Sequence, residues 1–148
     1  MLSQKAKYAL KAMIVLATQA EGDLLQAAEI AERQNVPRKF LELILLDLRK
    51  HGLVRSQRGK FGGYALAKPA DTITFGQIMR IMDGPLAPIP CASLTGYRRC
   101  ADCRDEKSCA VRKAMRQVRD AAAAILDGTT LADAIAAGHS EVKAAIGS

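Results

Sequence analysis

Four cysteines lie close together in the second half of the chain, with the spacing Cys91-x8-Cys100-x2-Cys103-x5-Cys109. A Cys-x2-Cys pair suits metal binding because one turn of chain can aim both thiolates at the same point. Four thiolates complete either a tetrahedral zinc site or an iron–sulfur cluster. The spacing does not choose between these metals, and it also allows a thiol switch or four cysteines with no ligand. All four cysteines are therefore candidate metal ligands.

The sequence predicts a cytoplasmic protein, and in that compartment clustered cysteines are more often metal ligands or redox groups than parts of a disulfide framework. The N-terminus, from Met1 to Lys7, has neither the apolar stretch nor the cleavage site of a secretory signal. The apolar runs are also far shorter than the ~18 residues that argue for a membrane-spanning helix. We therefore expect a cytoplasmic protein with no membrane partner.

Positive charge is concentrated in the first half of the chain. The formal net charge is +7, from 22 Lys and Arg against 15 Asp and Glu. Residues 1–70 hold 12 of these basic residues and 6 of the acidic ones, whereas residues 71–148 hold 10 and 9. Such a local excess favours a polyanion as partner, because neutralising phosphates releases condensed counterions. A solvated basic face with no partner is the alternative.

The apolar spacing of the first half predicts three helices. Ser3 is placed to cap the first helix, and Glu21-Gly22-Asp23 ends it. The second helix covers about Gln26 to Gln34. The third helix begins with Pro37 in its first turn and ends at Gly52, which suits the left-handed conformation of a helix end.

Two β-like stretches, Leu53–Ser56 and Tyr64–Ala67, follow the third helix. Between them lies a basic, glycine-rich hairpin tip in which Gly62 and Gly63 would permit close approach to DNA. This order of elements is typical of a winged helix-turn-helix, whose third helix enters the major groove while the hairpin lies along the backbone or minor groove. We therefore expect a mainly α fold with a small β-hairpin wing, and double-stranded DNA as partner.

The second half predicts a cysteine loop between two helices. A fourth helix opens at Asp71 or Thr74 and ends at Asp83. Residues 84–108 then form an irregular, proline-rich loop that holds three of the four cysteines. A long helix spans about Ser108 to Asp127, and a short helix follows it.

Small and apolar residues form a narrow seam along the long helix, at alternating spacings of three and four: Val111, Ala114, Val118, Ala121 and Ile125. This spacing is typical of a coiled coil. A second copy of the chain is the commonest partner for such a seam, although the helix could instead fold back and complete the core. We divide the chain into a winged helix-turn-helix domain (1–83), a cysteine loop (84–108), and a dimerisation helix with a C-terminal helix (109–148).

Catalysis is not expected from this composition. His51 and His139 are the only histidines, and His51 is placed at a helix end, where its charge would complement the dipole. No Ser/His/Asp arrangement, phosphate loop or pair of carboxylates stands out. A protein–protein adaptor that used the apolar seam would leave the basic hairpin unexplained.

Several short motifs, taken in order, resemble the IscR/NsrR/RirA group of bacterial transcription regulators, the Rrf2 family, over nearly the whole chain. The most specific is the wing, Arg58-Gly59-x-x-Gly62-Gly63-Tyr64. The others are Lys7–Leu10, Ala28–Ala31, Phe40–Glu42, Leu48–Val54, and Ile81–Pro85 leading into Cys91. The resemblance implies a homodimer crossed by the long helix on a near-palindromic operator. It also implies a [2Fe–2S] or [4Fe–4S] cluster in the cysteine loop that reports iron, redox state or nitric oxide, and we expect a repressor.

The family's usual three cysteine ligands map here onto Cys91, Cys103 and Cys109. The fourth ligand varies within the family. The position of a histidine ligand in some relatives is Arg112 here, and residues 5–11 hold none of the acidic side chains that other relatives use. We therefore expect Cys100 to be the fourth ligand. A structural zinc ion, or a thiol switch without metal, stays open as the alternative.

The expected DNA contacts lie on the third helix and the wing: Arg38, Lys39, Glu42, Arg49, Arg58, Lys60, Gly62, Gly63 and Tyr64. Arg38 and Lys39 are expected to contact phosphates or guanine edges, and Arg58 and Lys60 the backbone or minor groove. A carboxylate facing DNA costs affinity unless it accepts from cytosine N4, so Glu42 is expected to act as a sequence filter, as the resemblance also implies. A surface ion pair between Glu42 and Arg38 or Lys39 is the alternative.

Overall fold

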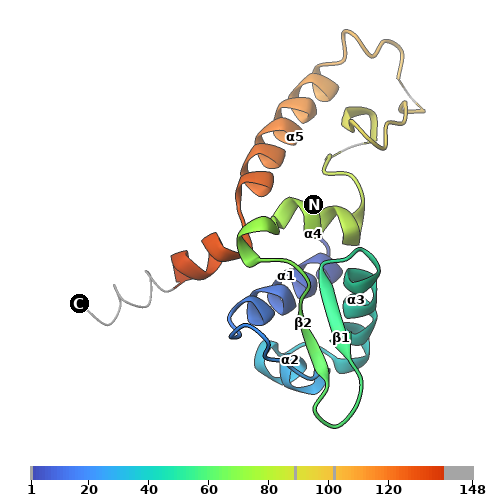
Figure 1. Ribbon diagram of the computed structural model, residues 1–148. Helices are drawn as coiled ribbons and strands as arrows, with labels where there is room; N and C mark the ends of the chain where they lie inside the picture. Colours follow the sequence, from blue (N-terminus) through green and yellow to red (C-terminus); the bar gives the residue numbers. More distant parts are fainter. Residues whose placement is uncertain (1, 89, 102, 139–148) are drawn as a thin grey trace.

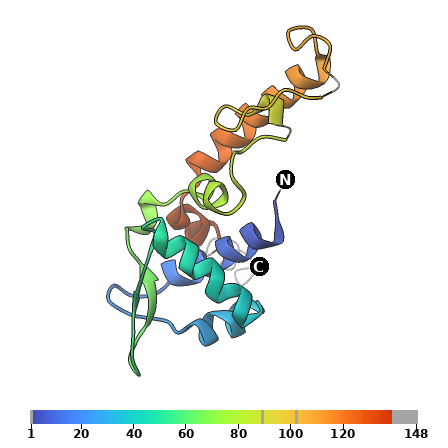
Figure 2. The same ribbon diagram turned by 90° about the vertical axis from the view of Figure 1, so that its right-hand side faces the viewer.

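The computed structural model describes residues 2–88, 90–101 and 103–138. The first half of the chain forms a helical head with a β-hairpin, and a long helix projects from this head together with the cysteine loop (Figure 1). The hairpin hangs at the bottom of Figure 1 and the loop lies at the top. A view from the side shows the same separation (Figure 2), so the two regions lie at opposite ends of the molecule.

Three helices build most of the head: α1 (Gln4–Ala17), α2 (Ala27–Gln34) and α3 (Arg38–Lys50). The Ser3 hydroxyl accepts a hydrogen bond from the N–H of Ala6 at 3.0 Å, which confirms the predicted cap of α1. The turn between α2 and α3 places Asn35 in the left-handed region, at φ +53°. Asparagine tolerates this conformation better than most residues, and it redirects the chain into α3.

The wing is an antiparallel pair of short strands, β1 (Val54–Gln57) and β2 (Gly63–Leu66). Val54 lies opposite Leu66, and Gln57 lies opposite Gly63. Compared with the predicted strands, the ladder ends one residue nearer the hairpin tip on both sides. The hairpin itself is confirmed, and its tip is tighter than the sequence suggested.

The remaining elements are η1 (Ala70–Thr72), α4 (Phe75–Asp83), η2 (Pro90–Ala92) and α5 (Ala110–Gly128). Of the two predicted starts of α4, Thr74 is the correct one, because its hydroxyl accepts from the N–H of Gln77 at 3.1 Å. Residues 131–138 are helical after α5, and residues 139–148 of the expected C-terminal segment lie outside the described residues. No helix in the described part of the chain is both long and apolar enough to span a bilayer.

One core joins the helices of the head to the chain beyond α5. Its largest fully buried side chains are Met13, Ile30, Leu41, Ile44, Leu45, Leu48, Leu53, Ile73, Ile78 and Leu131. The N–H of Leu131 donates to the carbonyl of Ile73 at 3.0 Å, and the N–H of Phe75 donates to the carbonyl of Thr129 at 2.9 Å. The chain therefore returns to the head after the long helix, which the apolar pattern did not predict.

A second link holds α5 to the head. Arg80 of α4 donates two hydrogen bonds to the carboxylate of Asp127, at 2.5 and 2.9 Å. These hydrogen bonds lower the pKa of Asp127 from its usual value. The carboxylate lies in the last turn of α5, where the helix dipole disfavours negative charge, so the guanidinium of Arg80 also offsets that repulsion.

The predicted seam of α5 faces solvent. Val111, Val118 and Ile125 are 62%, 41% and 67% exposed. The opposite face carries Arg119, which is only 7% exposed and donates to the carbonyl of Ala92 at 2.6 Å. Within the described residues, α5 therefore leaves its apolar seam uncovered and uses a buried arginine to hold the cysteine loop.

We predict that Arg119→Met loosens the cysteine loop. The change would leave the buried carbonyl of Ala92 without its donor, which costs about 1–3 kcal/mol of unfolding free energy. Urea unfolding and limited proteolysis of the loop measure the effect. Arg116→Met is the matched control, because Arg116 is exposed on the same helix. Equal stability and equal cleavage of the two variants would contradict the role given to Arg119.

Candidate nucleic-acid interface and cysteine centre

The first turns of α3 present the predicted DNA-contacting side chains to solvent. Arg38 and Lys39 are exposed at its N-terminus, one helical turn before Glu42. Arg38 Nε and Glu42 Oε1 form an ion pair at 3.1 Å, so the surface ion pair that the sequence allowed is present. Among the described residues Lys39 makes no ion pair. The positive charge at this end of α3 is therefore carried by Lys39, while Arg38 and Glu42 act as a pair.

The wing carries two more exposed basic residues, Arg58 and Lys60. The packing of the fold itself explains why Gly62 and Gly63 are glycines. A Cβ atom on Gly62 would lie 2.0 Å from the carbonyl oxygen of Gln57. A Cβ on Gly63, which has φ +149°, would lie 2.6 Å from the carbonyl oxygen of Leu25. Closure of the hairpin therefore requires Gly62, and the contact between the wing and Leu25 requires Gly63.

The structure fixes the wing to the helix-turn-helix through contacts that the sequence did not suggest. Leu25, just before α2, exchanges backbone hydrogen bonds with Tyr64 of β2, at 3.0 and 2.7 Å. On the other side, Arg49 of α3 donates to the hydroxyl of Ser56 in β1 at 3.0 Å. Two of the predicted DNA contacts, Arg49 and Tyr64, thus have structural partners within the head. These contacts hold the wing in a set position beside α3.

At the opposite end of the molecule, all four cysteines line one cavity of about 420 Å³ between the loop and the first turn of α5. Cys91 is buried on η2, and the Cys100 thiol lies 3.4 Å from its sulfur. The N–H of Cys103 donates to the carbonyl of Cys100 at 3.2 Å, which closes a turn over the Cys-x2-Cys pair. The Cys109 sulfur caps α5 by accepting from the N–H of Arg112 at 3.4 Å.

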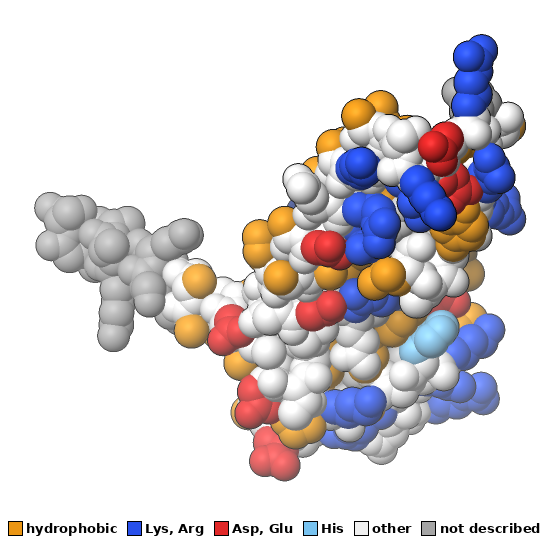
Figure 3. Space-filling model, turned by 90° about the horizontal axis from the view of Figure 1, so that it is seen from above, with side chains coloured by type: hydrophobic (Ala, Val, Ile, Leu, Met, Phe, Trp, Pro, Cys, Tyr) orange, Lys and Arg blue, Asp and Glu red, His pale blue; other side chains and the backbone are white. Residues whose placement is uncertain are grey.

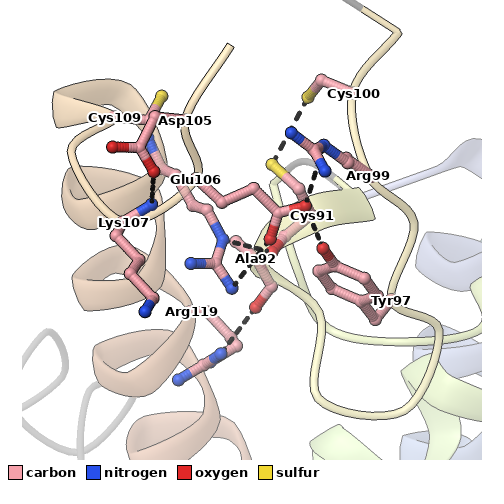
Figure 4. A network of polar contacts seen from close by, with 11 residues as sticks. Cys91, Ala92, Tyr97, Arg99, Cys100, Asp105, Glu106, Lys107, Cys109 and Arg119 are labelled. Carbon is pink, nitrogen blue, oxygen red and sulfur yellow. Dashed lines mark hydrogen bonds and ion pairs between the residues drawn. The ribbon is translucent and has the colours of Figure 1, made fainter. Parts of the chain in front are cut away.

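Arg112 connects the two ends of the cysteine constellation. Its Nε donates to the carbonyl of Cys91 at 2.9 Å, and its guanidinium lies 3.8 Å from the Glu106 carboxylate. Glu106 also accepts a hydrogen bond from the Tyr97 hydroxyl and pairs with Arg99 at 3.5 Å (Figure 4). The hydrogen bond to Glu106 raises the pKa of Tyr97 above its usual value. Motif reasoning did not single out Glu106 or Tyr97.

Basic side chains also surround this end of the molecule. Figure 3 looks down on the end opposite the hairpin, where blue Lys and Arg side chains crowd the right-hand half and an acidic group lies at the lower left. The exposed basic residues of the loop are Arg98, Arg99, Arg104 and Lys107. Such surroundings, together with the positive end of the α5 dipole at Cys109, complement the negative charge of metal-bound thiolates.

The donor set fits a metal centre held by thiolates, because all four cysteines line the same cavity. Within the described ranges, no three Cys, His, Asp or Glu side chains are grouped closely enough to hold a single metal ion. A tetrahedral zinc site needs all four sulfurs at about 2.3 Å from one point. The four thiols line one cavity, and four thiolates are the donor set of either a zinc site or an iron–sulfur cluster.

Comparison with known proteins agrees with the predicted fold. The family model described as Rrf2, iron-dependent transcriptional regulator, matches residues 2–137. An Rrf2-like HTH-type regulator of Rhodobacter capsulatus is 46% identical over 146 residues, 97% of either chain. The structure of CymR, the global cysteine regulator of B. subtilis, matches with a TM-score of 0.74 and 34% identity over 90% of this chain and 94% of that one. IscR of T. potens matches with a TM-score of 0.74 and 29% identity, over 93% and 88%.

These matches confirm the predicted winged helix-turn-helix architecture, with its mostly helical fold and two-stranded hairpin. The matched proteins regulate transcription and are not named for any catalysed reaction. The chain belongs to the Rrf2 family of DNA-binding transcriptional regulators.

Proposed function

We propose that this regulator binds a near-palindromic operator as a homodimer and represses transcription, with an iron–sulfur cluster in the cysteine loop adjusting its affinity. The observation that carries the proposal is that Cys91, Cys100, Cys103 and Cys109 all line the same cavity. Cys91 lies on η2, Cys100 and Cys103 lie in one turn of the loop, and Cys109 is the N-cap of α5. A group held by all four would therefore fix the loop to the helix.

The chain's own residues prepare two of the proposed ligands. Arg112 and Arg119 hold the carbonyls of Cys91 and Ala92, so the position of Cys91 follows α5. Cys109 is part of α5 itself, as its N-cap. Cys100 and Cys103 share a turn and supply the other two thiolates. When bound, the cluster supplies a redox-active centre that is sensitive to iron supply and to oxidants.

The same helix supplies the proposed dimer contact. The seam formed by Val111, Ala114, Val118, Ala121 and Ile125 is exposed along its length. A second copy of α5 would cover it, since an apolar coiled-coil seam pairs with a similar one. In such a dimer, the two α3 helices must be spaced by about one turn of DNA, ~34 Å. A shift of ~1–3 kcal/mol between two dimer states changes operator affinity about 5- to 150-fold.

A thiol switch is the second candidate, because one pair of cysteines is already in contact. The sulfurs of Cys91 and Cys100 are 3.4 Å apart. Oxidation of the two thiols by hydrogen peroxide would form one disulfide and two molecules of water. The similar structure of B. subtilis CymR is described as that of a global cysteine regulator. This candidate needs only two of the four thiols.

We predict that Cys103→Ala and Cys109→Ala abolish cluster binding and the response of DNA binding to iron. Anaerobic reconstitution, visible absorbance, and iron and sulfide analysis give the readout. Ser108→Ala is the matched control, since Ser108 lines the same cavity without offering a thiolate. A wild type that takes up no iron and sulfide would contradict the cluster. If Cys103→Ala and Cys109→Ala keep the redox response while Cys100→Ser loses it, the thiol switch is the mechanism.

We predict that Glu42→Ala broadens the choice of operator sequence. The carboxylate lowers the affinity for duplexes whose bases offer it no hydrogen-bond donor, and the change to alanine removes this penalty. Related duplexes that the wild type discriminates by ~1–3 kcal/mol of binding free energy should therefore bind with more similar affinities. Competition binding against a set of single-base variants measures this. Glu32→Ala on α2 is the control, because it removes the same negative charge at another exposed position. A uniform change in affinity for all duplexes, equal in both variants, would count against the filter role.

A further inference from the structure

Phe61 at the tip of the wing is exposed without any covering element. Its exposed fraction is 86%, the largest among the exposed large hydrophobic residues of the described chain. Single exposed hydrophobic residues are ordinary on protein surfaces, so exposure alone implies nothing. The backbone around Phe61 and the charges near it indicate that this exposed ring contacts a partner.

The tip holds Phe61 in a closed turn. The N–H of Gly62 donates to the carbonyl of Gly59 at 3.0 Å, which places Lys60 and Phe61 at the two central positions. Side chains at these positions point away from the hairpin. The tight closure needs Gly62, because a Cβ there would overlap the carbonyl of Gln57.

The turn is also tied to the helix-turn-helix. The side chain of Gln26, the residue just before α2, donates to the carbonyl of Lys60 at 3.4 Å. Its neighbour Leu25 pairs with Tyr64 of β2. The position of the Phe61 ring relative to α3 is therefore set by the head.

The surroundings of the ring favour a polyanion. Arg58 and Lys60 are exposed beside it, and Lys60 Nζ lies 5.8 Å from the ring centroid. No acidic residue occurs between Asp47 and Asp71, so this whole stretch of chain carries positive charge alone. An apolar ring next to cations matches the minor groove, which has phosphates on both sides and base edges at its floor.

We propose that Phe61 is a wedge that enters the minor groove and partly unstacks a base step under the wing. The proposal rests on the DNA binding by α3 and the wing described above. Apolar side chains inserted from the minor groove kink a duplex toward the major groove. Pyrimidine–purine steps unstack most easily, so the wedge adds sequence preference without any hydrogen bond to a base. Arg58 and Lys60 would hold the phosphates while the ring makes this contact.

The experiment starts from duplexes selected by the wild-type protein from a random library. Three variants are then compared on the best duplex: Phe61→Ala, Phe61→Leu and Lys60→Ala. Titrations at several salt concentrations give the affinity and its salt dependence, and energy transfer between dyes at the two ends gives the bend. Thermal unfolding checks that each variant is folded, which is expected because both side chains are exposed.

Phe61→Ala should bind ~5- to 100-fold more weakly, bend the duplex less, and lose the preference for a pyrimidine–purine step under the wing. Its salt slope should stay that of wild type, because no charge is lost. Phe61→Leu should keep most of the affinity and bend, since leucine also acts as a wedge. Lys60→Ala should instead lower the salt slope by about one and keep the bend.

The wedge is overturned if Phe61→Ala binds and bends the selected duplex as wild type does. It is equally overturned if Phe61→Ala changes only self-association in sedimentation experiments, since the ring would then contact a second copy of the protein instead of DNA. Failure of the wild type to select any duplex would overturn operator binding itself. That result differs from the other two, because they are measured on a duplex that wild type recognises.

Discussion

The cysteine loop keeps its position through arginine hydrogen bonds to its backbone. A long irregular loop cannot satisfy its carbonyls through a ladder of its own, so it needs donors from elsewhere. Arg112 and Arg119 supply them to adjacent carbonyls, at residues 91 and 92, from positions two turns apart on one face of α5. The opposite face of the helix is left to its apolar seam. One helix thus carries the cysteine centre on one side and a free surface on the other.

Two contacts at the far end of α5 carry its position into the head. Asp127 pairs with Arg80 of α4, and Leu131 is fully buried in the core that also holds α3. A helix is a stiff element, so a displacement at its start is accompanied by a displacement at its end. Under the proposed function, the cysteines at one end of α5 therefore act on the spacing of two heads through a rigid helix. The wing and the loop need no direct contact for this.

Local sequence patterns predicted the helices and strands of this fold, but they could not predict contacts between segments far apart in the chain. Ser3 and Thr74 were identified as helix caps because a cap depends on neighbours three residues away. The pairing of Leu25 with Tyr64, and the burial of Leu131, join segments about 40 and more than 50 residues apart, and no periodicity reports such contacts. Arg119 lies off the predicted seam, and neither the charge pattern nor the apolar spacing shows that its side chain is a buried donor. The four cysteines were found from spacing, and their shared cavity required the structure.

The wing motif contains residues that the fold requires and residues that are available to a binding partner. Gly62 and Gly63 are needed for closure of the hairpin and contact with Leu25, whether or not DNA is bound. Tyr64 is likewise held within the head. In contrast, within the described residues the side chains of Arg58 and Phe61 make no hydrogen bond or ion pair, and Phe61 has the Lys60 ammonium beside its ring. Residues that the fold does not need, yet that it holds in a fixed position, are those best placed to meet a partner. In this wing they are a cation and an aromatic ring, which together suit the charge and the shape of a minor groove.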